Sequence, residues 1–181
     1  MRRFPFLRVA AAVAVGILAA GLATAPSFAA TVLWSRLETG VGGNNAEGLY
    51  LTVAGYSTAN GANAQVADYD NRTTGSQFWQ WFRVPGGEWA LRNAGTTDWK
   101  ALSIKGNAAG NGVQVVQWQY EQSNRYEQWT QATSGGITRY KNVGTGYCLA
   151  VAGGGNGRVP SGANVITWNC TGGSDQDWTW Q

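Results

Sequence analysis

Residues 162–181 read GANVITWNCTGGSDQDWTWQ, an alternating apolar and polar run that leads into Gln176-Asp177-Trp178. Two similar triplets lie upstream, Gln77-Phe78-Trp79 and Glu127-Gln128-Trp129. Their tryptophans and Trp178 recur at intervals of 50 and 49 residues. A fixed period of this length is typical of a domain built from repeated structural units.

Two further landmarks keep the same period. An apolar alternation ending in glycine precedes each triplet, at Leu51–Gly55, Leu102–Gly106 and Leu149–Gly153. A second alternating run begins at Gly61, Gly112 and Gly162. Alternation with period two predicts strands with one buried face, and Asn-Gly pairs predict turns with a positive φ. No amphipathic helical pattern follows residue 29, so the sequence predicts an all-β domain of three similar units.

This pattern resembles the ricin B-type lectin family, which shares its fold with carbohydrate-binding module family 13. The resemblance implies a β-trefoil of three pseudo-symmetric repeats, at about 31–86, 87–135 and 136–181. It also implies that Trp79, Trp129 and Trp178 pack in the core near the pseudo-threefold axis. Cys148 and Cys170 occupy the two places that family repeats often join by a disulfide, while the other repeats hold Tyr50 and Tyr69, and Ala101 and Tyr120.

The same resemblance implies where a sugar would bind. In the family, an aspartate two residues after the first cysteine place and an asparagine before Gln-x-Trp bind sugar hydroxyls. An aromatic ring two residues before the second cysteine place stacks on the apolar sugar face. No repeat of this chain has the aspartate, because Thr52, Ser103 and Ala150 occupy that place.

Two repeats nevertheless keep part of the expected site. The third has Trp168 at the aromatic place and Asp175 at the asparagine place. The second has Trp118 and Ser103, with Asn124 displaced by a one-residue insertion. The first repeat has Ala67 at the aromatic place and is expected to be structural. The competing interpretation is that Trp118 and Trp168 pack against neighbouring strands and that Asp175 caps a turn.

Residues 1–29 have the organisation of a secretory signal peptide, with a basic start, an apolar stretch and small residues before Ala30. A membrane anchor is the alternative, but the apolar run is short for a span. The segment contains three of the 13 basic residues, so residues 30–181 carry ten basic and ten acidic side chains. This balance gives no support for a nucleic-acid or membrane partner once the signal is cleaved.

The chain contains no histidine and two cysteines. Without histidine, Ser-His-Asp and Cys-His catalysis and histidine-based metal sites are excluded. In an oxidising compartment, two cysteines favour one disulfide over two free thiols. We therefore expect a secreted, monomeric, non-catalytic lectin without metal or cofactor that binds galactose- or xylose-type glycans weakly at several sites. The alternative is a β-trefoil that has lost sugar binding and recognises a protein partner, for instance as a protease inhibitor.

Overall fold

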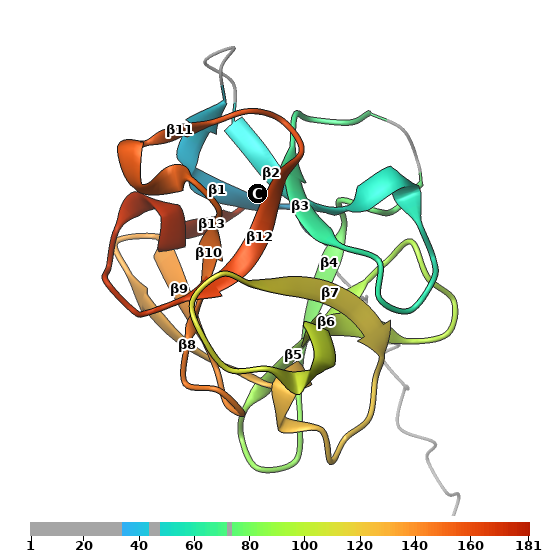
Figure 1. Ribbon diagram of the computed structural model, residues 1–181. Helices are drawn as coiled ribbons and strands as arrows, with labels where there is room; N and C mark the ends of the chain where they lie inside the picture. The colour runs from blue at the N-terminus through green and yellow to red at the C-terminus, as the bar shows by residue number, and fades with distance from the viewer. Residues whose placement is uncertain (1–33, 44–47, 72–73) are drawn as a thin grey trace, which may run out of the picture. The chain divides into compact units, whose positions relative to one another are not determined.

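The computed structural model describes residues 34–43, 48–71 and 74–181, so the predicted signal peptide and its cleavage site lie outside the described residues. These residues form thirteen strands and five three-residue 3-10 turns, with no α-helix among them (Figure 1). Within the described ranges, no helix is long and apolar enough to cross a membrane.

The strands are β1 Leu37–Gly43, β2 Gly48–Val53, β3 Ala64–Ala67, β4 Trp79–Arg83, β5 Trp89–Asn93, β6 Lys100–Ile104, β7 Val113–Gln119, β8 Trp129–Ser134, β9 Ile137–Asn142, β10 Cys148–Val151, β11 Arg158–Val159, β12 Ala163–Trp168 and β13 Trp178–Trp180. The 3-10 turns are η1 Ala54–Tyr56, η2 Lys105–Asn107, η3 Arg125–Glu127, η4 Gly154–Asn156 and η5 Ser174–Gln176. The alternating runs found in the sequence correspond to β2, β3, β6, β7, β10 and β12.

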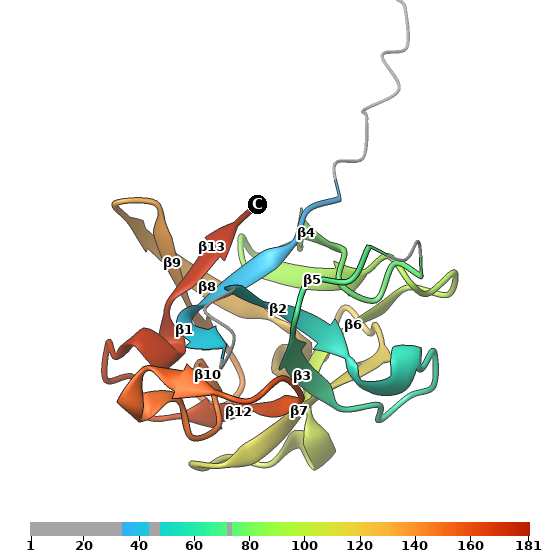
Figure 2. The ribbon, with the colours of Figure 1, turned by 90° about the horizontal axis from the view of Figure 1, so that it is seen from above.

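Each repeat contributes two strands to a barrel and one hairpin that caps it. The barrel strands pair in the order β1, β13, β9, β8, β5 and β4, and a bridge between Ser35 and Trp79 closes the ring. The hairpins are β2–β3, β6–β7 and β10–β12. Figure 2 shows the barrel strands on one side and β7 and β12 on the other. This topology is a β-trefoil, so the fold predicted from the repeats is confirmed.

Three glycine turns connect the repeats around the axis. Gly61, Gly112 and Gly162 have φ angles of 79°, 79° and 90°, a conformation that a side chain would strain. Each glycine donates its N–H to a strand carbonyl of the next repeat, through the bonds Gly61 to Gln117 (2.9 Å), Gly112 to Thr167 (2.8 Å) and Gly162 to Val66 (2.8 Å). The three bonds form a closed cycle, which fixes the hairpins relative to one another.

The motif tryptophans lie in the core, as the sequence predicts. Trp79, Trp129 and Trp178 are all 0% exposed. Their indole N–H groups donate to the carbonyls of the repeated leucines: Leu51 at 3.0 Å, Leu102 at 3.2 Å and Leu149 at 3.3 Å. Because a buried indole N–H needs a partner, these bonds let three large rings share one core.

Two strands differ from the expectation of a single buried face. All residues of β6 and β10 are buried. Small side chains at alternate positions lie opposite large ones, since Ala101 pairs with Trp118 and Cys148 pairs with Trp168. The second face of each strand is thus also removed from water.

Candidate functional site

The surface has a cavity in each of the three repeats, beside the cap hairpin. The cavity volumes are about 140 Å³ in the first repeat, 320 Å³ in the second and 360 Å³ in the third. Each cavity lies between the second strand of the hairpin and the glycine-containing turn that follows the first strand. Pseudo-threefold symmetry thus produces three comparable hollows whose side chains differ.

The third-repeat cavity contains both residues that the sequence places there. Trp168, at the end of β12, is 40% exposed, and Asp175 lies on η5 across the cavity. Val151 and Ile166 form an apolar wall. No protein group in the described ranges hydrogen-bonds the Asp175 carboxylate, and Asp175 is not the capping residue of its turn. The arrangement places an exposed ring and a carboxylate around one hollow.

Gly154 allows the floor of this cavity to form. A Cβ atom at this position would lie 2.8 Å from the Asp175 Cβ and 3.0 Å from Val41 Cγ1. Both distances are shorter than ordinary van der Waals contact, so η4 can approach η5 this closely only without a side chain. The missing Cβ therefore helps to position Asp175.

The place of the family aspartate differs between the two larger cavities. Ala150 is 0% exposed and does not line the third-repeat cavity, so β10 contributes no polar group at this place. Ser103, its counterpart on β6, is 3% exposed and does line the second-repeat cavity. A hydroxyl is thus available in the second repeat and absent from the third.

The second-repeat cavity brings together Trp118, Ser103 and Asn124. Trp118 is 44% exposed, which excludes a core role for its ring. Asn124 is already engaged within the protein, since its Oδ1 accepts from the Tyr126 N–H at 3.1 Å and its Nδ2 donates to Glu127 Oε1 at 2.9 Å. One N–H and one lone pair remain for a ligand.

Glu121 also lines the second-repeat cavity, and sequence reasoning missed it. It lies outside the places that the family motif uses, and it is an exposed residue just after β7. Its proximity depends on how the segment between β7 and η3 folds back. The available sequence signal is that Glu121 directly follows Tyr120, the residue at the second cysteine place of this repeat.

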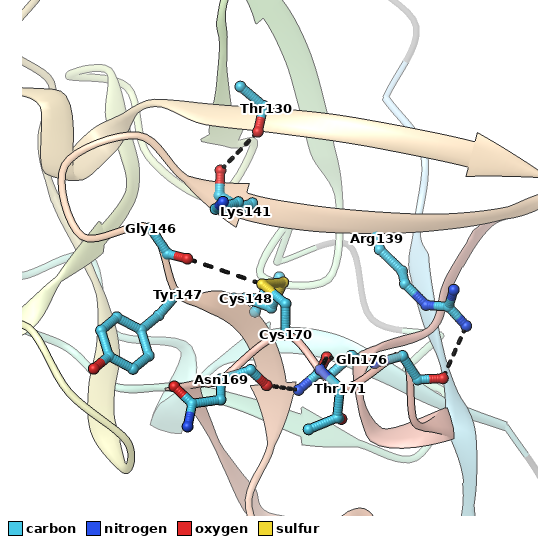
Figure 3. Close-up of a disulfide and its surroundings, with 12 residues drawn as sticks. Thr130, Arg139, Lys141, Gly146, Tyr147, Cys148, Asn169, Cys170, Thr171 and Gln176 are labelled. Atoms are coloured by element: carbon cyan, nitrogen blue, oxygen red, sulfur yellow. Dashed lines mark hydrogen bonds between the residues drawn. A yellow bond between two sulfur atoms is a disulfide. The ribbon is translucent and has the colours of Figure 1, made fainter.

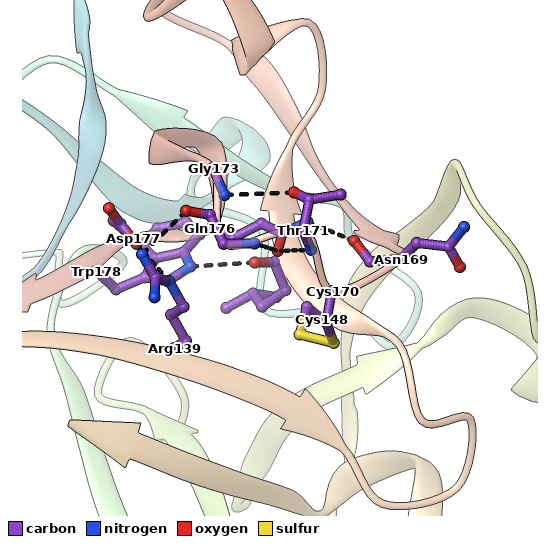
Figure 4. Close-up of polar contacts among 11 residues, drawn as sticks. Arg139, Cys148, Asn169, Cys170, Thr171, Gly173, Gln176, Asp177 and Trp178 are labelled. Atoms are coloured by element: carbon purple, nitrogen blue, oxygen red, sulfur yellow. Dashed lines mark hydrogen bonds and ion pairs between the residues drawn. A yellow bond between two sulfur atoms is a disulfide. The ribbon is translucent and has the colours of Figure 1, made fainter. Parts of the chain in front are cut away.

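The buried glutamines of the motif hold the segment beside the first-repeat and third-repeat cavities. Gln176 accepts from the Thr171 N–H at 2.9 Å and donates to the Asn169 carbonyl at 2.7 Å (Figure 4). Gln77 makes the corresponding bonds to the Asp70 N–H at 2.9 Å and the Asp68 carbonyl at 2.8 Å. The motif glutamine therefore orders the segment between the aromatic place and the core tryptophan.

Glu127 takes the place of this glutamine in the second repeat. Its side chain is 0% exposed and accepts from the Glu121 N–H at 2.7 Å and from Asn124 at 2.9 Å. The pKa of the Glu127 carboxyl is raised to about 7, because burial and, to a smaller extent, the nearby Glu121 charge outweigh the two hydrogen bonds, which lower it. Glu127 therefore titrates near neutrality and hydrogen-bonds two residues that line the cavity, Glu121 and Asn124.

The first-repeat cavity is the smallest and lacks the stacking ring. Ala67 occupies the aromatic place, and Thr52, Asp68 and Asp70 supply polar groups. Tyr56 is 39% exposed and lines the opposite side. The first-repeat cavity thus differs from the other two in its smaller volume and in the absence of a tryptophan from its lining.

A disulfide holds the hairpin of the third repeat. Cys148 and Cys170 are bonded with their Cα atoms 5.1 Å apart, which confirms the pairing expected from the sequence (Figure 3). The first repeat has an edge-to-face contact between Tyr50 and Tyr69 at the same place, with ring centroids 6.0 Å apart. Either pair fastens the start of the hairpin to its end, close to the aromatic place.

The described residues contain no group of three or more histidine, cysteine, aspartate or glutamate side chains arranged to hold a metal ion. The polar side chains around the two larger cavities are one hydroxyl, three amides and two carboxylates, spread over two sites. Such groups can hydrogen-bond a polyhydroxylated ligand while the exposed indole ring contacts its apolar face.

Comparison with known proteins supports the geometry. A family model described as a ricin-type β-trefoil lectin domain matches residues 39–178. The designed threefold-symmetric protein ThreeFoil is similar at a TM-score of 0.69 and 26% identity, over 81% of this chain and 96% of that one. A search of curated proteins finds no match.

Two natural proteins share the fold at lower identity. The C-half of an earthworm R-type lectin, solved with GalNAc, has a TM-score of 0.57 and 16% identity, over 82% of this chain and 97% of that one. An exo-β-1,3-galactanase from Clostridium thermocellum has a TM-score of 0.65 and 22% identity, over 81% of this chain. The match spans only 29% of the galactanase, so it concerns one part of that enzyme.

Proposed function

The chain belongs to the ricin-type β-trefoil lectin family, and on this premise we propose that it is a secreted, non-catalytic lectin with weak sugar sites in its second and third repeats. The observation that carries the proposal is the pair of exposed rings, Trp118 and Trp168, each beside a cavity with polar groups. An indole that remains exposed at the family's stacking place suits the apolar face of a pyranose. Galactose- and xylose-type sugars are the candidates that the family implies.

Each site is expected to be weak. The family aspartate is replaced by Ser103 in the second repeat and by Ala150 in the third. A lost charge-assisted hydrogen bond is worth roughly 1.5–3 kcal/mol, and each factor of ten in affinity corresponds to about 1.4 kcal/mol. Single-site dissociation constants of about 1 mM follow. A polysaccharide that engages both repeats would gain affinity through the high effective concentration of the second site.

Binding should depend on the Trp168 ring. We expect Trp168→Ala to lower the affinity for a galactan or xylan by roughly tenfold because it removes one aromatic contact and the benefit of two-site binding. Trp168→Phe, which retains a ring, should retain most of the affinity. Calorimetry measures the binding, and thermal unfolding should show nearly unchanged midpoints because the ring is exposed.

Two results would contradict the assignment. Full polysaccharide binding by Trp168→Ala would exclude a sugar contact for this ring, and loss of binding only through unfolding would make the ring structural. Failure of the unmodified protein to bind any glycan on an array would favour recognition of a protein partner, since none of the repeats keeps the family aspartate.

Secretion is supported by the signal-like pattern of residues 1–29 and by the disulfide, a bond that persists in oxidising compartments. N-terminal sequencing of exported protein should therefore begin at Ala30. Exported protein that still begins at Met1 would argue against cleavage.

A further inference from the structure

Trp99 has a backbone conformation that aromatic residues rarely adopt. Its φ angle is +56°, in the left-handed region that favours glycine. In the third repeat the corresponding residue is Gly146, with a φ angle of +76°. The correspondence follows from strand register, because Ala101 pairs with Trp118 as Cys148 pairs with Trp168. The third repeat thus has a glycine at this place, whereas the second repeat adopts the same conformation with a strained, bulky residue.

The ring of Trp99 is held in place and remains exposed. It contacts the Phe82 ring with centroids 5.1 Å apart and the Tyr120 ring at 6.5 Å, and the Arg92 guanidinium lies 4.3 Å from its centroid. Even so, Trp99 is 45% exposed. Strained residues that persist in a fold cluster at functional sites, and a fixed exposed ring is suited to stacking on a ligand. We call Phe82, Trp99 and Tyr120 the aromatic strip.

The aromatic strip continues the second-repeat cavity. Tyr120 directly follows β7 and lies two residues beyond Trp118 in the sequence. The Tyr120 N–H donates to the Trp99 carbonyl at 2.9 Å, which aligns Trp99 with the same end of the hairpin. Glu121, the residue after Tyr120, lines the cavity. The strip therefore begins where the cavity ends.

The other repeats have no equivalent strip. In the third repeat Gly146 and Cys170 stand at the places of Trp99 and Tyr120, and in the first repeat Gly48 and Tyr69 do. The disulfide uses Cys170, and Tyr69 contacts Tyr50. Any contact made by the strip is thus specific to the second repeat.

We infer that the second repeat is an extended site for a glycan chain, with one sugar against Trp118 in the cavity and a following sugar stacked on Trp99. The third repeat, by contrast, is a single-sugar site. The inference rests on the proposed lectin function and adds the class of ligand, a linear oligosaccharide. Glu121 lines the same cavity as Trp118 and directly follows Tyr120 of the strip, so it can accept hydrogen bonds from sugar hydroxyls there.

The test isolates the second repeat by using Trp168→Ala as the background. Calorimetry compares xylose with xylotetraose, and galactose with β-1,3-linked galactotetraose. The background protein should bind one tetrasaccharide more tightly than its single sugar. Adding Trp99→Gly, the residue of the third repeat, should lower tetrasaccharide affinity by roughly threefold to tenfold and remove this gain with chain length.

Two control variants separate binding from folding. Trp99→Phe keeps a ring on the strip and should keep most of the gain. Ile137→Ala removes an exposed apolar side chain outside the strip and should leave the gain unchanged. If Trp99→Gly keeps the gain, or weakens single-sugar and tetrasaccharide binding equally, the extended site is wrong while the lectin function stands. If the unmodified protein binds none of the four ligands, both proposals fail.

Discussion

At the residue scale, Glu127 replaces a glutamine that both accepts and donates in the other two repeats. Gln77 and Gln176 donate to the carbonyls of Asp68 and Asn169, and the corresponding carbonyl in the second repeat belongs to Gln119. An ionised glutamate cannot donate to it. The second repeat therefore loses one buried hydrogen bond and buries a carboxylate when Glu127 is charged.

This substitution predicts a pH dependence of stability. The pKa of Glu127 is about 7 in the folded protein, above its ordinary 4.5, so the folded state binds the proton more tightly than the unfolded state. The contribution of Glu127 is present in full below pH 4.5 and is lost as the pH rises through about 7. The free energy of unfolding should thus fall by roughly 2–4 kcal/mol from this residue between about pH 5 and pH 8.

Glu127→Gln should remove that component and make the protein more stable than the unmodified form at about pH 8, because the amide is neutral and can donate. Urea titrations at the two pH values measure the difference. Glu88→Gln, at a partly exposed acid remote from the motif, serves as the control and should retain the pH dependence. Identical pH profiles for the unmodified protein and Glu127→Gln would show that Glu127 does not titrate in this range.

At the element scale, the features that the sequence predicts are those that local patterns specify. The strands β2, β6 and β10 are each followed, two residues after their last residue, by a glycine with positive φ, namely Gly55, Gly106 and Gly153. The apolar alternation and the glycine that follows it are close together in the sequence. A strand and the turn after it can therefore be predicted without knowledge of distant contacts. The fixed period then predicts the trefoil arrangement of these hairpins.

Features of the site that depend on contacts between elements were harder to predict. Asn124 was expected at the cavity and does line it, but its bonds to Tyr126 and Glu127 follow from the conformation of η3. The position of Glu121 depends on the same turn. The positive φ of Trp99 is a property of the folded backbone, and its correspondence with Gly146 follows only from strand register. Sequence spacing gives the places of a motif, whereas the partners of each side chain come from tertiary packing.

The disulfide of the third repeat and the tyrosine pair of the first repeat both join the two ends of a hairpin. The disulfide between Cys148 and Cys170 closes a loop with a sequence separation of 22 residues. Chain entropy then stabilises the folded third repeat by about 3 kcal/mol. In the first repeat the Tyr50–Tyr69 contact constrains the folded state only and is worth roughly 0.5–1.5 kcal/mol beyond its buried area. The third repeat has the largest of the three repeat cavities, and its hairpin is the more strongly stabilised of the two.

At the scale of the whole molecule, the three repeats share one core and cannot be stable separately. Trp79, Trp129 and Trp178 belong to one cluster with Leu51, Leu102 and Leu149. The cyclic bonds of the glycine turns link every repeat to the next. Because each repeat completes the burial of its neighbours, the described domain should unfold as a unit.

Trp129→Ala tests this shared core. The ring is 0% exposed, so its removal leaves a cavity and the unpaired carbonyl of Leu102, and should lower the free energy of unfolding by about 3–5 kcal/mol. The loss should shift a single cooperative transition, because Trp129 contacts a core that all three repeats form. Urea unfolding followed by circular dichroism measures the midpoint and the number of transitions.

An undetectable shift would place the ring outside the core, and an early separate transition would mean that the second repeat unfolds alone. Trp118→Ala, which removes an exposed ring of the same repeat, should leave the midpoint nearly unchanged, so the comparison separates the ring that builds the fold from the ring that is available to a ligand.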